Sequence, residues 1–434
     1  MKKNMKRAAI TLTMMAMAMT GCTGCNSDND SQESTLIIDP VVPPTIELTR
    51  AEREMVGHSN EFAFNLFRTA TKTTYKGENG LNQPKSIIVS PISITFALGM
   101  LNNGAVGETQ AQINKVLGFG ETGADGINAF CNKMQSAAPA LDPKTKVMIA
   151  NNIYLNKGYE LKPDFVQIAK DFYNATPESR DFHDGKTMGV INQWAADHTE
   201  QMIKEVLNPG TFNPDAVSYL LNAIYFKGDW TKKFNKAETK KEVFEHAGYT
   251  KELTYAEMMH QTATFEYGEN KNYQALRLPY GNDSYQMTIL LPKAQTNALP
   301  TVPTTEEWQQ LDQQMNTAVV DVKLPRFESN TDIDLLDIMS ALGMPDAFNP
   351  AKANFSNFCY APTYIGLMKQ VAKIKLDEEG SEAAAVTVIG MYKNAVPDEP
   401  EPKIYYFHAN HPFLYVISER QTGAIFFIGQ YTGY

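Results

Sequence analysis

The segment Asp377–Val388 reads DEEGSEAAAVTV: three acidic residues, a glycine, and then mostly small or β-branched side chains. In a β-strand, successive side chains point to opposite faces. One face would then carry no charge and consist of Ser381, Ala383, Ala385, Thr387, Ile389 and Met391. The other would carry Glu382, Ala384, Val386, Val388 and Gly390. The segment can therefore form a strand with one face suited to a packed interior, while Glu382 stays in solvent.

The backbone of this segment is also suited to a strand. No proline occurs between Gly380 and Val396, so every N–H needed for ladder hydrogen bonds is present. If the segment joined a sheet as an added strand, it would form about a dozen new ladder hydrogen bonds. At roughly 1 kcal/mol net each, these bonds would release on the order of 10 kcal/mol. An Ala-rich helix is the alternative, because Glu and Ala favour helices. The segment lacks a 3.6-residue apolar stripe, which favours the strand.

The N-terminus has the pattern of an export signal. Four basic residues in Met1–Arg7 precede the apolar run Ala8–Thr20, which is too short to span a bilayer. The run ends in Thr20-Gly21-Cys22, which resembles a bacterial lipobox, and Cys25 offers an alternative site. We therefore predict a signal peptide over residues 1–22, a lipidated Cys22 that anchors the chain in a lipid bilayer, and an outer-membrane or cell-surface location.

Composition limits the remaining possibilities. Residues 23–55 are rich in Ser, Asp, Asn and Pro, which predicts a disordered tether, with the folded domain over residues 56–434. A net charge of -10 argues against a nucleic-acid partner. Cys22 and Cys25 have no second pair to complete a zinc site, and Cys131 and Cys359 are expected to be buried small hydrophobes. We expect no metal, no cofactor and a monomer.

Residues 59–434 show periodic apolar patterns without an internal repeat. Helical spacing predicts a first helix capped by Ser59 or Asn60, and helices over Ile92–Leu101, Thr109–Leu117, Pro163–Tyr173, Gly189–Val206 and Asp332–Leu342. Short β-branched or aromatic runs predict strands over Ser86–Val89, Met148–Leu155, Tyr219–Phe226, Ala275–Leu278, Gln286–Leu291, Ala318–Leu324, Val371–Leu376, Phe413–Ser418 and Ala424–Gly429. Because strands and helices do not alternate strictly, we predict one α+β domain.

The string Gly118–Gly123 matches G-x-G-x-x-G, the dinucleotide-binding fingerprint. That motif needs a preceding strand and a helix that opens on it. Here it follows a predicted helix and runs into Ala124–Gly126, which we interpret as a loop. A helix C-cap and turn at Gly118 is the better interpretation.

Several strings together resemble the landmarks of the serpin family, in family order and spacing. They are Val89–Ser93 (VSPIS), Asn103–Thr109 (NGAVGET), Leu221–Trp230 (LNAIYFKGDW), Leu324–Phe327 (LPRF) and Asn410–Phe413 (NHPF). The segment Asp377–Val388 is similar to the hinge of inhibitory serpins. The resemblance implies a single domain with three β-sheets, eight or nine helices and an exposed reactive loop near the C-terminus.

The resemblance also implies an activity without catalysis. Serpins trap serine endopeptidases, and cysteine endopeptidases are left open as a second target class. The protease cleaves the loop, the loop inserts into the central sheet, and the protease is trapped as an acyl-enzyme. The implied partners are trypsin-, elastase-, chymotrypsin- or subtilisin-like enzymes, and the implied hinge residues are Glu378, Glu379, Gly380, Ser381, Glu382, Ala383, Ala384, Ala385, Val386 and Thr387.

The position of the cleaved bond has two candidates. Counting from the hinge glycine, as the family resemblance implies, gives Asn394–Ala395. Side-chain chemistry favours Lys393–Asn394, because Lys393 suits an acidic specificity pocket of trypsin type. The stretch Val396–Lys403 (VPDEPEPK) is Pro-rich and acidic, and is expected to be extended and exposed.

Two further groups follow from the resemblance. Near the upper end of the central sheet, where the loop begins, Arg326, Glu378 and Trp230 match family residues that hold the loop entrance shut. The alternative is a surface ion pair of about 0–1 kcal/mol. Beneath the sheet, the matching polar cluster is Ser90, Ser93, Asn222 and Gln370. Gln370 replaces the usual histidine, and Gln201 stands where glycine is common.

Three rival functions predict other features of the sequence. A non-inhibitory serpin, acting as a carrier, chaperone or cleaved substrate, would typically carry charged, bulky or Pro residues in the hinge. A lipid-anchored hydrolase would be expected to show a G-x-S-x-G elbow, which this sequence lacks. A passive adhesion lipoprotein would leave the hinge pattern unexplained.

Overall fold

The computed structural model describes residues 43–72, 75–76, 82–120, 122–248, 254–294, 298–380 and 403–433. This part contains eight α-helices and three β-sheets, which confirms the predicted α+β class. The helices are α1 (Arg50–Ala70), α2 (Pro91–Asn102), α3 (Glu108–Leu117), α4 (Gly123–Ala137), α5 (Pro163–Tyr173), α6 (Thr187–His198), α7 (Thr305–Gln313) and α8 (Leu336–Leu342). Three short 3₁₀ turns add η1 (Ala138–Ala140), η2 (Lys236–Glu238) and η3 (Pro345–Phe348).

The central sheet has five strands in the order β12-β13-β6-β4-β5. They are β12 (Phe327–Asp334), β13 (Leu367–Leu376), β6 (Ser218–Gly228), β4 (Thr145–Asn156) and β5 (Glu178–Arg180). β12 pairs with β13 and β6 pairs with β4 in antiparallel fashion, whereas β13 and β6 run parallel. A parallel pair therefore lies in the middle of the sheet.

A second sheet of nine strands carries the C-terminal part of the chain. Its order is β14-β11-β8-β9-β10-β15-β16-β3, with β7 also paired to β8. The strands are β14 (Ile404–His408), β11 (Asn316–Pro325), β8 (Thr254–Glu269), β9 (Tyr273–Tyr280), β10 (Tyr285–Pro292), β15 (Phe413–Glu419), β16 (Ile425–Tyr431), β3 (Ile87–Val89) and β7 (Lys240–Phe244). The third sheet is the short pair β1 (Tyr75–Lys76) and β2 (Asn82–Gln83).

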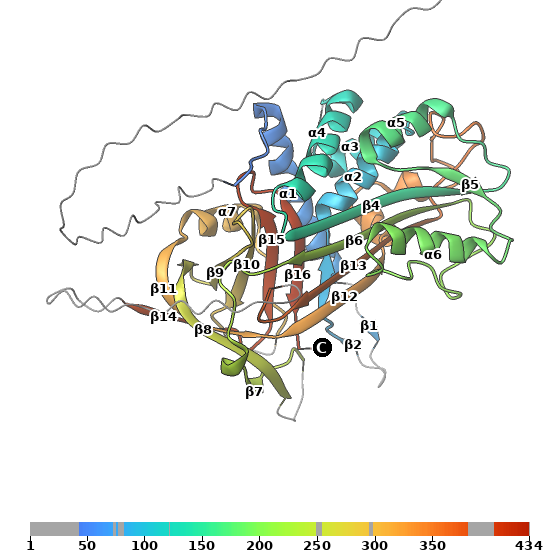
Figure 1. The fold of residues 1–434 in the computed structure, drawn as a ribbon. Coiled ribbons are helices and arrows are strands. Elements are labelled where there is room, and N and C mark those ends of the chain that lie inside the picture. Colours follow the sequence, from blue (N-terminus) through green and yellow to red (C-terminus); the bar gives the residue numbers. More distant parts are fainter. Residues whose placement is uncertain are drawn as a thin grey trace, which may run out of the picture. The chain divides into compact units, whose positions relative to one another are not determined.

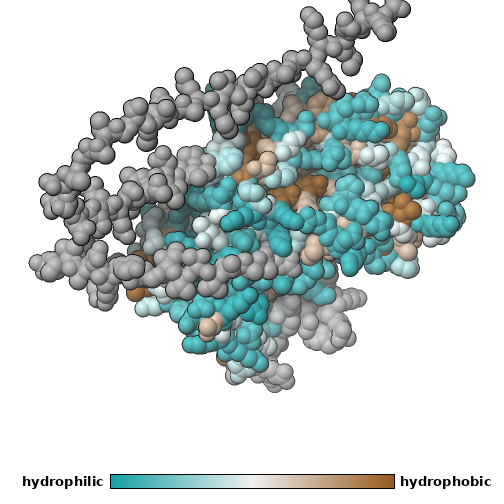
Figure 2. Space-filling model, viewed as in Figure 1, coloured by the Kyte–Doolittle hydropathy of each residue, from teal (hydrophilic) through white to brown (hydrophobic). Residues whose placement is uncertain are grey.

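Two apolar cores lie on opposite faces of the central sheet. The larger core packs α1 and α2 against the sheets, and α2 is buried on every side. The smaller core lies under α6, which crosses the other face of the sheet (Figure 1) and contributes Ile191 and Ala195 against Leu221 and Val371. Cys131 and Cys359 are both buried, as expected. The visible surface is mainly hydrophilic, with hydrophobic residues in small groups (Figure 2).

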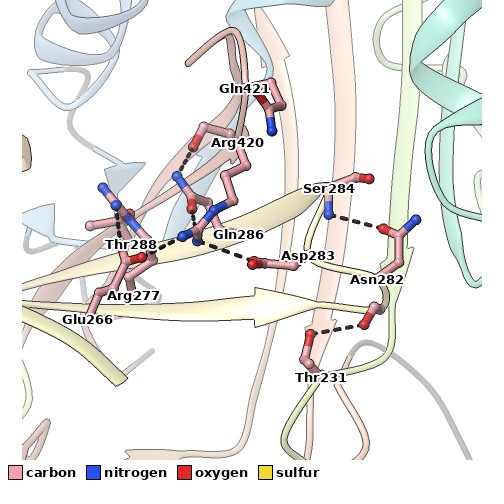
Figure 3. A network of polar contacts seen from close by, with 12 residues as sticks. Thr231, Glu266, Arg277, Asn282, Asp283, Ser284, Gln286, Thr288, Arg420 and Gln421 are labelled. Atoms are coloured by element: carbon pink, nitrogen blue, oxygen red, sulfur yellow. Dashed lines mark hydrogen bonds and ion pairs between the residues drawn. The ribbon is translucent and has the colours of Figure 1, made fainter. Parts of the chain in front are cut away.

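A polar network braces one face of the nine-stranded sheet (Figure 3). Glu266 on β8 accepts hydrogen bonds from Arg277 on β9 and from Arg420 after β15. Arg420 also donates to Asp283 and Gln286, each at 3.2 Å. Burial raises the pKa of Glu266, but hydrogen bonds and charges of the two arginines outweigh burial and leave this pKa below its ordinary value. The network links three strands and two turns.

The first helix begins earlier than the sequence analysis predicted. Its N-cap is Thr49, not Ser59 or Asn60, and a capping box joins Thr49 to Glu52 in both directions. Residues 50–55, predicted to belong to the tether, are therefore part of α1, and Met55 is buried. The overlooked signal was a threonine followed three residues later by glutamate.

Three other local predictions were wrong. Residues 332–342 form the end of β12 and then α8, because strict alternation of buried and exposed residues continues to Asp334. The helix predicted to reach Val206 ends at His198. Ala124–Gly126 lies inside α4, not in a loop. The interpretation of Gly118 as a C-cap is confirmed by its φ of 69°.

Gln201, the residue noted in place of a common glycine, adopts a left-handed backbone. Its φ is 64°, and the preceding Glu200 has a φ of 47°. A left-handed conformation costs a residue with a Cβ roughly 1–2 kcal/mol. The Gln201 N–H donates to the carbonyl of Ala196 at 2.8 Å, which closes the end of α6 in this conformation.

Candidate functional site

The chain leaves the central sheet through the tight turn Asp377–Gly380. The Asp377 N–H donates to the Gly380 carbonyl at 2.9 Å, and Gly380 has a φ of 129°. A Cβ at Gly380 would lie 2.3 Å from the carbonyl oxygen of Gly228. Glycine is therefore required by close backbone approach as well as by its φ.

Many predicted residues of the loop and anchor lie outside the described part of the chain. They are Ser381, Glu382, Ala383, Ala384, Ala385, Val386, Thr387, Lys393, Asn394, Ala395, Cys22 and Cys25. The hinge residues Glu378, Glu379 and Gly380 are described and buried. The structure therefore gives the two ends at which the loop is attached.

Glu378, Arg326 and Trp230 meet at the loop entrance. The Glu378 carboxylate, 1% exposed, accepts hydrogen bonds from the Arg326 guanidinium and from the Thr239 hydroxyl. Burial raises the pKa of Glu378, but the hydrogen bonds from Arg326 and Thr239 outweigh burial and place this pKa below its ordinary value. A buried carboxylate does not fit the alternative of a surface ion pair. That these residues hold the entrance shut stays a prediction.

Trp230 fixes the same turn from the side. Its ring stacks on Tyr280 with centroids 4.3 Å apart, and its Nε1–H donates to the carbonyl of Asp377 at 3.0 Å. Its backbone N–H donates to the carbonyl of Glu379 at 2.8 Å. Trp230 therefore contacts the turn through both its side chain and its backbone.

A second acidic residue at the entrance was given no partner in the sequence analysis. The Glu379 carboxylate lies 3.0 Å from the ammonium of Lys233 and 3.2 Å from that of Lys236. Burial lowers the pKa of Lys233, but hydrogen bonds to Glu379 and Asp229 outweigh burial and raise this pKa. The sequence signals for this contact were the two consecutive glutamates before Gly380 and the basic string at residues 232–236.

The polar cluster beneath the sheet is fully buried and densely bonded. Gln370 on β13 faces Asn222 on β6, and its Nε2 donates to the Asn222 Oδ1 at 2.6 Å. The Gln370 side chain also bonds to the backbone of Ser90. Its Oε1 accepts from the Ser90 N–H at 2.9 Å, and its Nε2 donates to the Ser90 carbonyl at 3.0 Å. The Ser93 hydroxyl donates to the Asn222 Oδ1 at 2.8 Å. The structure thus brings all four predicted residues together.

Gln370 supplies both a donor and an acceptor, so a glutamine satisfies this position without a titratable group. Sequence reasoning missed Asn151 on β4, which accepts from Asn222 Nδ2 at 2.6 Å and donates to the Ser93 carbonyl at 3.3 Å. An asparagine within an apolar strand was the only signal for it. The cluster therefore spans three adjacent strands.

The loop returns to the fold through β14, whose His408 side chain is held by a partly buried carboxylate. Asp321 on β11 lies 2.7 Å from His408 Nε2 on β14 and 3.0 Å from His260 Nε2 on β8. The Thr262 hydroxyl donates to the same carboxylate at 2.8 Å. Burial raises the pKa of Asp321, but the bonds from these three side chains outweigh burial and lower this pKa to about 2.

The contacts of Asp321 with His260, Thr262 and His408 were not predicted, because the sequence analysis did not identify β8 and β14 as strands. Both strands carry many polar residues, so their apolar alternation is weak. Within the described ranges, no group of three or more His, Cys, Asp or Glu side chains could hold a metal ion. No helix of this part is long and apolar enough to cross a membrane.

A family model described as serpin (serine protease inhibitor) matches residues 57–433, and the chain therefore belongs to the serpin family. Serpin B6 of Macaca fascicularis is 32% identical over 386 residues, which cover 86% of this chain and 97% of that protein. The native state of tengpin, a thermophilic serpin, has a TM-score of 0.77 and 27% identity, and covers 91% of this chain and 97% of its own.

Human thyroxine-binding globulin, solved in complex with thyroxine, shows the same fold. Its TM-score is 0.76 at 23% identity, and the match covers 88% of this chain and 98% of that chain. At this identity the likeness concerns the fold alone. Serpins are generally protease inhibitors, not enzymes, but the fold does not by itself specify inhibition.

Arg326→Met should destabilise the protein by about 2 kcal/mol, because it leaves the buried Glu378 carboxylate without its cation. The double variant Arg326→Met/Glu378→Gln removes both charges and should recover part of that loss. Urea unfolding followed by tryptophan fluorescence measures both. Arg50→Met, which removes an arginine that is 90% exposed, is the matched control and should change little. Equal losses in the single and double variants would contradict the charge argument.

Asp321→Asn tests the carboxylate that holds β14. A folded pKa of about 2, below the ordinary 3.8, stabilises the protein at pH values above about 4, and the gain is lost as pH falls toward 2. The free energy of unfolding of the wild-type protein should therefore exceed that of the variant by about 2 kcal/mol at pH 6, and the two values should converge near pH 2. Urea unfolding across this range measures the difference.

The control for this titration is Asp215→Asn, at an exposed aspartate that lies 3.1 Å from His183. This substitution should cost little at any pH. A wild-type advantage over Asp321→Asn that stays constant from pH 6 to pH 2 would exclude the proposed role of the Asp321 charge.

Proposed function

We propose that this protein inhibits serine endopeptidases as a suicide substrate, with cysteine endopeptidases as a second class of target. In this proposal the protease cleaves a bond between Gly380 and Lys403, and the freed segment inserts between β13 and β6. The protease remains attached as an acyl-enzyme and is distorted. The parallel pairing of β13 with β6 is the observation that carries the proposal.

The strand directions favour insertion at this place. The register of β13 with β6 runs from Leu367↔Tyr219 to Lys373↔Tyr225, and both strands continue beyond it toward Gly380. A segment that turns back after Gly380 would run antiparallel to both neighbours. The parallel pair would be replaced by two antiparallel pairs, which are slightly more stable per residue. The free energy released would drive the trapping step.

The side chains next to that seam favour a small, uncharged incoming face. On the core side, β13 presents Met368, Gln370, Ala372 and Ile374, all buried. A charge brought into this layer without a partner would be costly. The sequence of the loop offers Ser381, Ala383 and Ala385 on the face that would enter it.

A carrier function is the second candidate, because thyroxine-binding globulin shares the fold. That function does not require a segment that can insert. The uncharged face and the absence of proline between Gly380 and Val396 favour the inhibitor, whereas the parallel seam belongs to the shared fold and does not distinguish the two functions.

The test of inhibition is complex formation. The full-length chain is incubated with trypsin-, chymotrypsin-, elastase- and subtilisin-like enzymes, and denaturant-resistant complexes are sought. Nicking of the loop by every enzyme without any complex would refute the proposal. Mass measurement of the C-terminal fragment under denaturing conditions places the bond, since cleavage after Asn394 leaves Ala395–Tyr434, 40 residues.

Ser381→Arg should convert the inhibitor into a substrate, because it places a charge on the entering face. The number of inhibitor molecules consumed per trapped protease should rise by about tenfold or more, since about 3 kcal/mol or more of burial cost opposes insertion. Glu382→Arg, on the opposite face, is the matched control and should leave trapping intact. Equal trapping by both variants would count against the assigned faces.

We further infer that the mature chain is a monomer tethered to a bilayer through Cys22, with Cys25 as the alternative, at the outer membrane or cell surface. The basic start, the short apolar run and the Thr-Gly-Cys string support this inference. Incorporation of labelled palmitate into the wild-type chain, and its loss in Cys22→Ser but not in Cys25→Ser, is the expected result. Equal labelling of all three chains would reject the Cys22 anchor.

A further inference from the structure

Strand β14 exposes two large apolar side chains directly after the loop returns to the fold. Ile404 is 44% exposed and Tyr406 is 62% exposed. Two residues apart on one strand, they point to the same face. Phe407, by contrast, is fully buried in the core. The exposed pair is therefore held in a fixed orientation by a strand that is anchored from its other side.

The surroundings of Tyr406 form a preformed hollow. It has a volume of about 440 Å³ and is lined by Gln274, Leu291, Pro292, Lys293, Tyr406, His408 and His411. Gln274 Nε2 donates to the Tyr406 carbonyl at 3.1 Å, and the Tyr406 ring stands edge-on to His408 with centroids 5.7 Å apart. His408 is itself held by Asp321. The hollow is thus bordered by an exposed tyrosine whose neighbours are fixed.

This combination has the character of a docking surface. Aromatic side chains beside a pocket, with hydrogen-bonding groups around them, are typical of the residues that dominate protein interfaces. Exposed large apolar residues also lower the solubility of a protein when no partner covers them. The partner that suits this surface presents an aliphatic or aromatic side chain from a protruding surface loop.

The short connection between the loop and β14 indicates which partner lies close to this surface. The loop leaves the described fold at Gly380 and returns at Lys403, one residue before Ile404. From Ala395 to Lys403 the chain spans at most about 27 Å when fully extended. An enzyme that holds the Asn394–Ala395 bond in its active site must therefore lie within that reach of β14, and a typical protease is larger than this distance.

We propose that Ile404, Tyr406 and the adjoining hollow form a second docking surface for the target protease, which contacts a part of the enzyme outside its substrate cleft. The proposal rests on the proposed inhibitory function and specifies how the partner is recognised. The surface acts on capture, since it is available before cleavage. It takes no part in insertion, because β14 belongs to the nine-stranded sheet and not to the central one.

The test uses the full-length chain and the protease that forms the most rapid complex. Ile404→Ser/Tyr406→Ser should slow complex formation by about tenfold or more. The number of inhibitor molecules consumed per trapped protease should stay unchanged. Binding of the same protease with its catalytic serine replaced by alanine should weaken by a similar factor. Tyr406→Thr, which retains a strand-forming residue, provides a milder second variant.

The matched control is Tyr360→Ser, at an exposed tyrosine that is 64% exposed. The Tyr360 N–H donates to the carbonyl of Glu160 at 3.1 Å, beyond the end of β4 that is remote from Gly228 and the loop. This variant should capture protease at the wild-type rate. Thermal midpoints close to the wild-type value in all variants exclude misfolding as the cause of a slower rate.

The outcomes are separable. If the wild-type chain traps protease and the β14 variants trap it equally fast, the docking surface is refuted while the inhibitory function stands. If the wild-type chain forms no complex with any enzyme, both proposals fall. If the wild-type chain instead forms a dimer that Ile404→Ser/Tyr406→Ser abolishes without changing the capture rate, the surface serves a second copy and the protease assignment is overturned.

Discussion

The parallel pairing of β13 with β6 is the constraint on which the rest of the molecule depends. The two strands share one register, while the chain that leaves β13 has the composition of a further strand. A parallel ladder is slightly weaker per residue than an antiparallel one, so the seam between these strands is a weak place in the sheet. Under the proposed function, the fold keeps this seam closed until one peptide bond is cut, and helices on both faces support it.

Apolar residues of both strands pack on each face of the seam, and polar contacts also join the strands across it. Gln370 and Asn222 bond across it at 2.6 Å. At its upper end Trp230, which follows β6, donates from its backbone N–H to the carbonyl of Glu379 and from its Nε1–H to the carbonyl of Asp377. A hydrogen bond contributes little net free energy when its groups can exchange partners, whereas parting an interlocked apolar layer would open cavities. A polar closure can therefore be specific in the folded state and still be replaced by new strand bonds.

The sequence allowed the strongly periodic elements to be predicted, such as α5 over Pro163–Tyr173 and the buried strand β10. It did not reveal β8, because a strand whose two faces contact both core and solvent carries many polar residues. The helix predicted from Asp332 failed because alternation in β12 continues further than a helical pattern suggests. Arg326, Glu378 and Trp230 followed from the family resemblance. Asn151 and Asp321 depend on which strands become neighbours, and no local pattern encodes that.

The two attachment points of the loop lie in different sheets, and this has a consequence for what cleavage leaves behind. Gly380 bridges to Asp229 beside the central sheet, while Lys403 leads into β14 of the nine-stranded sheet. A cut between them divides the chain into two polypeptides, and the shorter one contains β14, β15 and β16. Since β15 lies between β10 and β16 and all its residues are buried, the short piece is an interior part of the product. The cleaved protein would therefore persist as a non-covalent two-chain assembly.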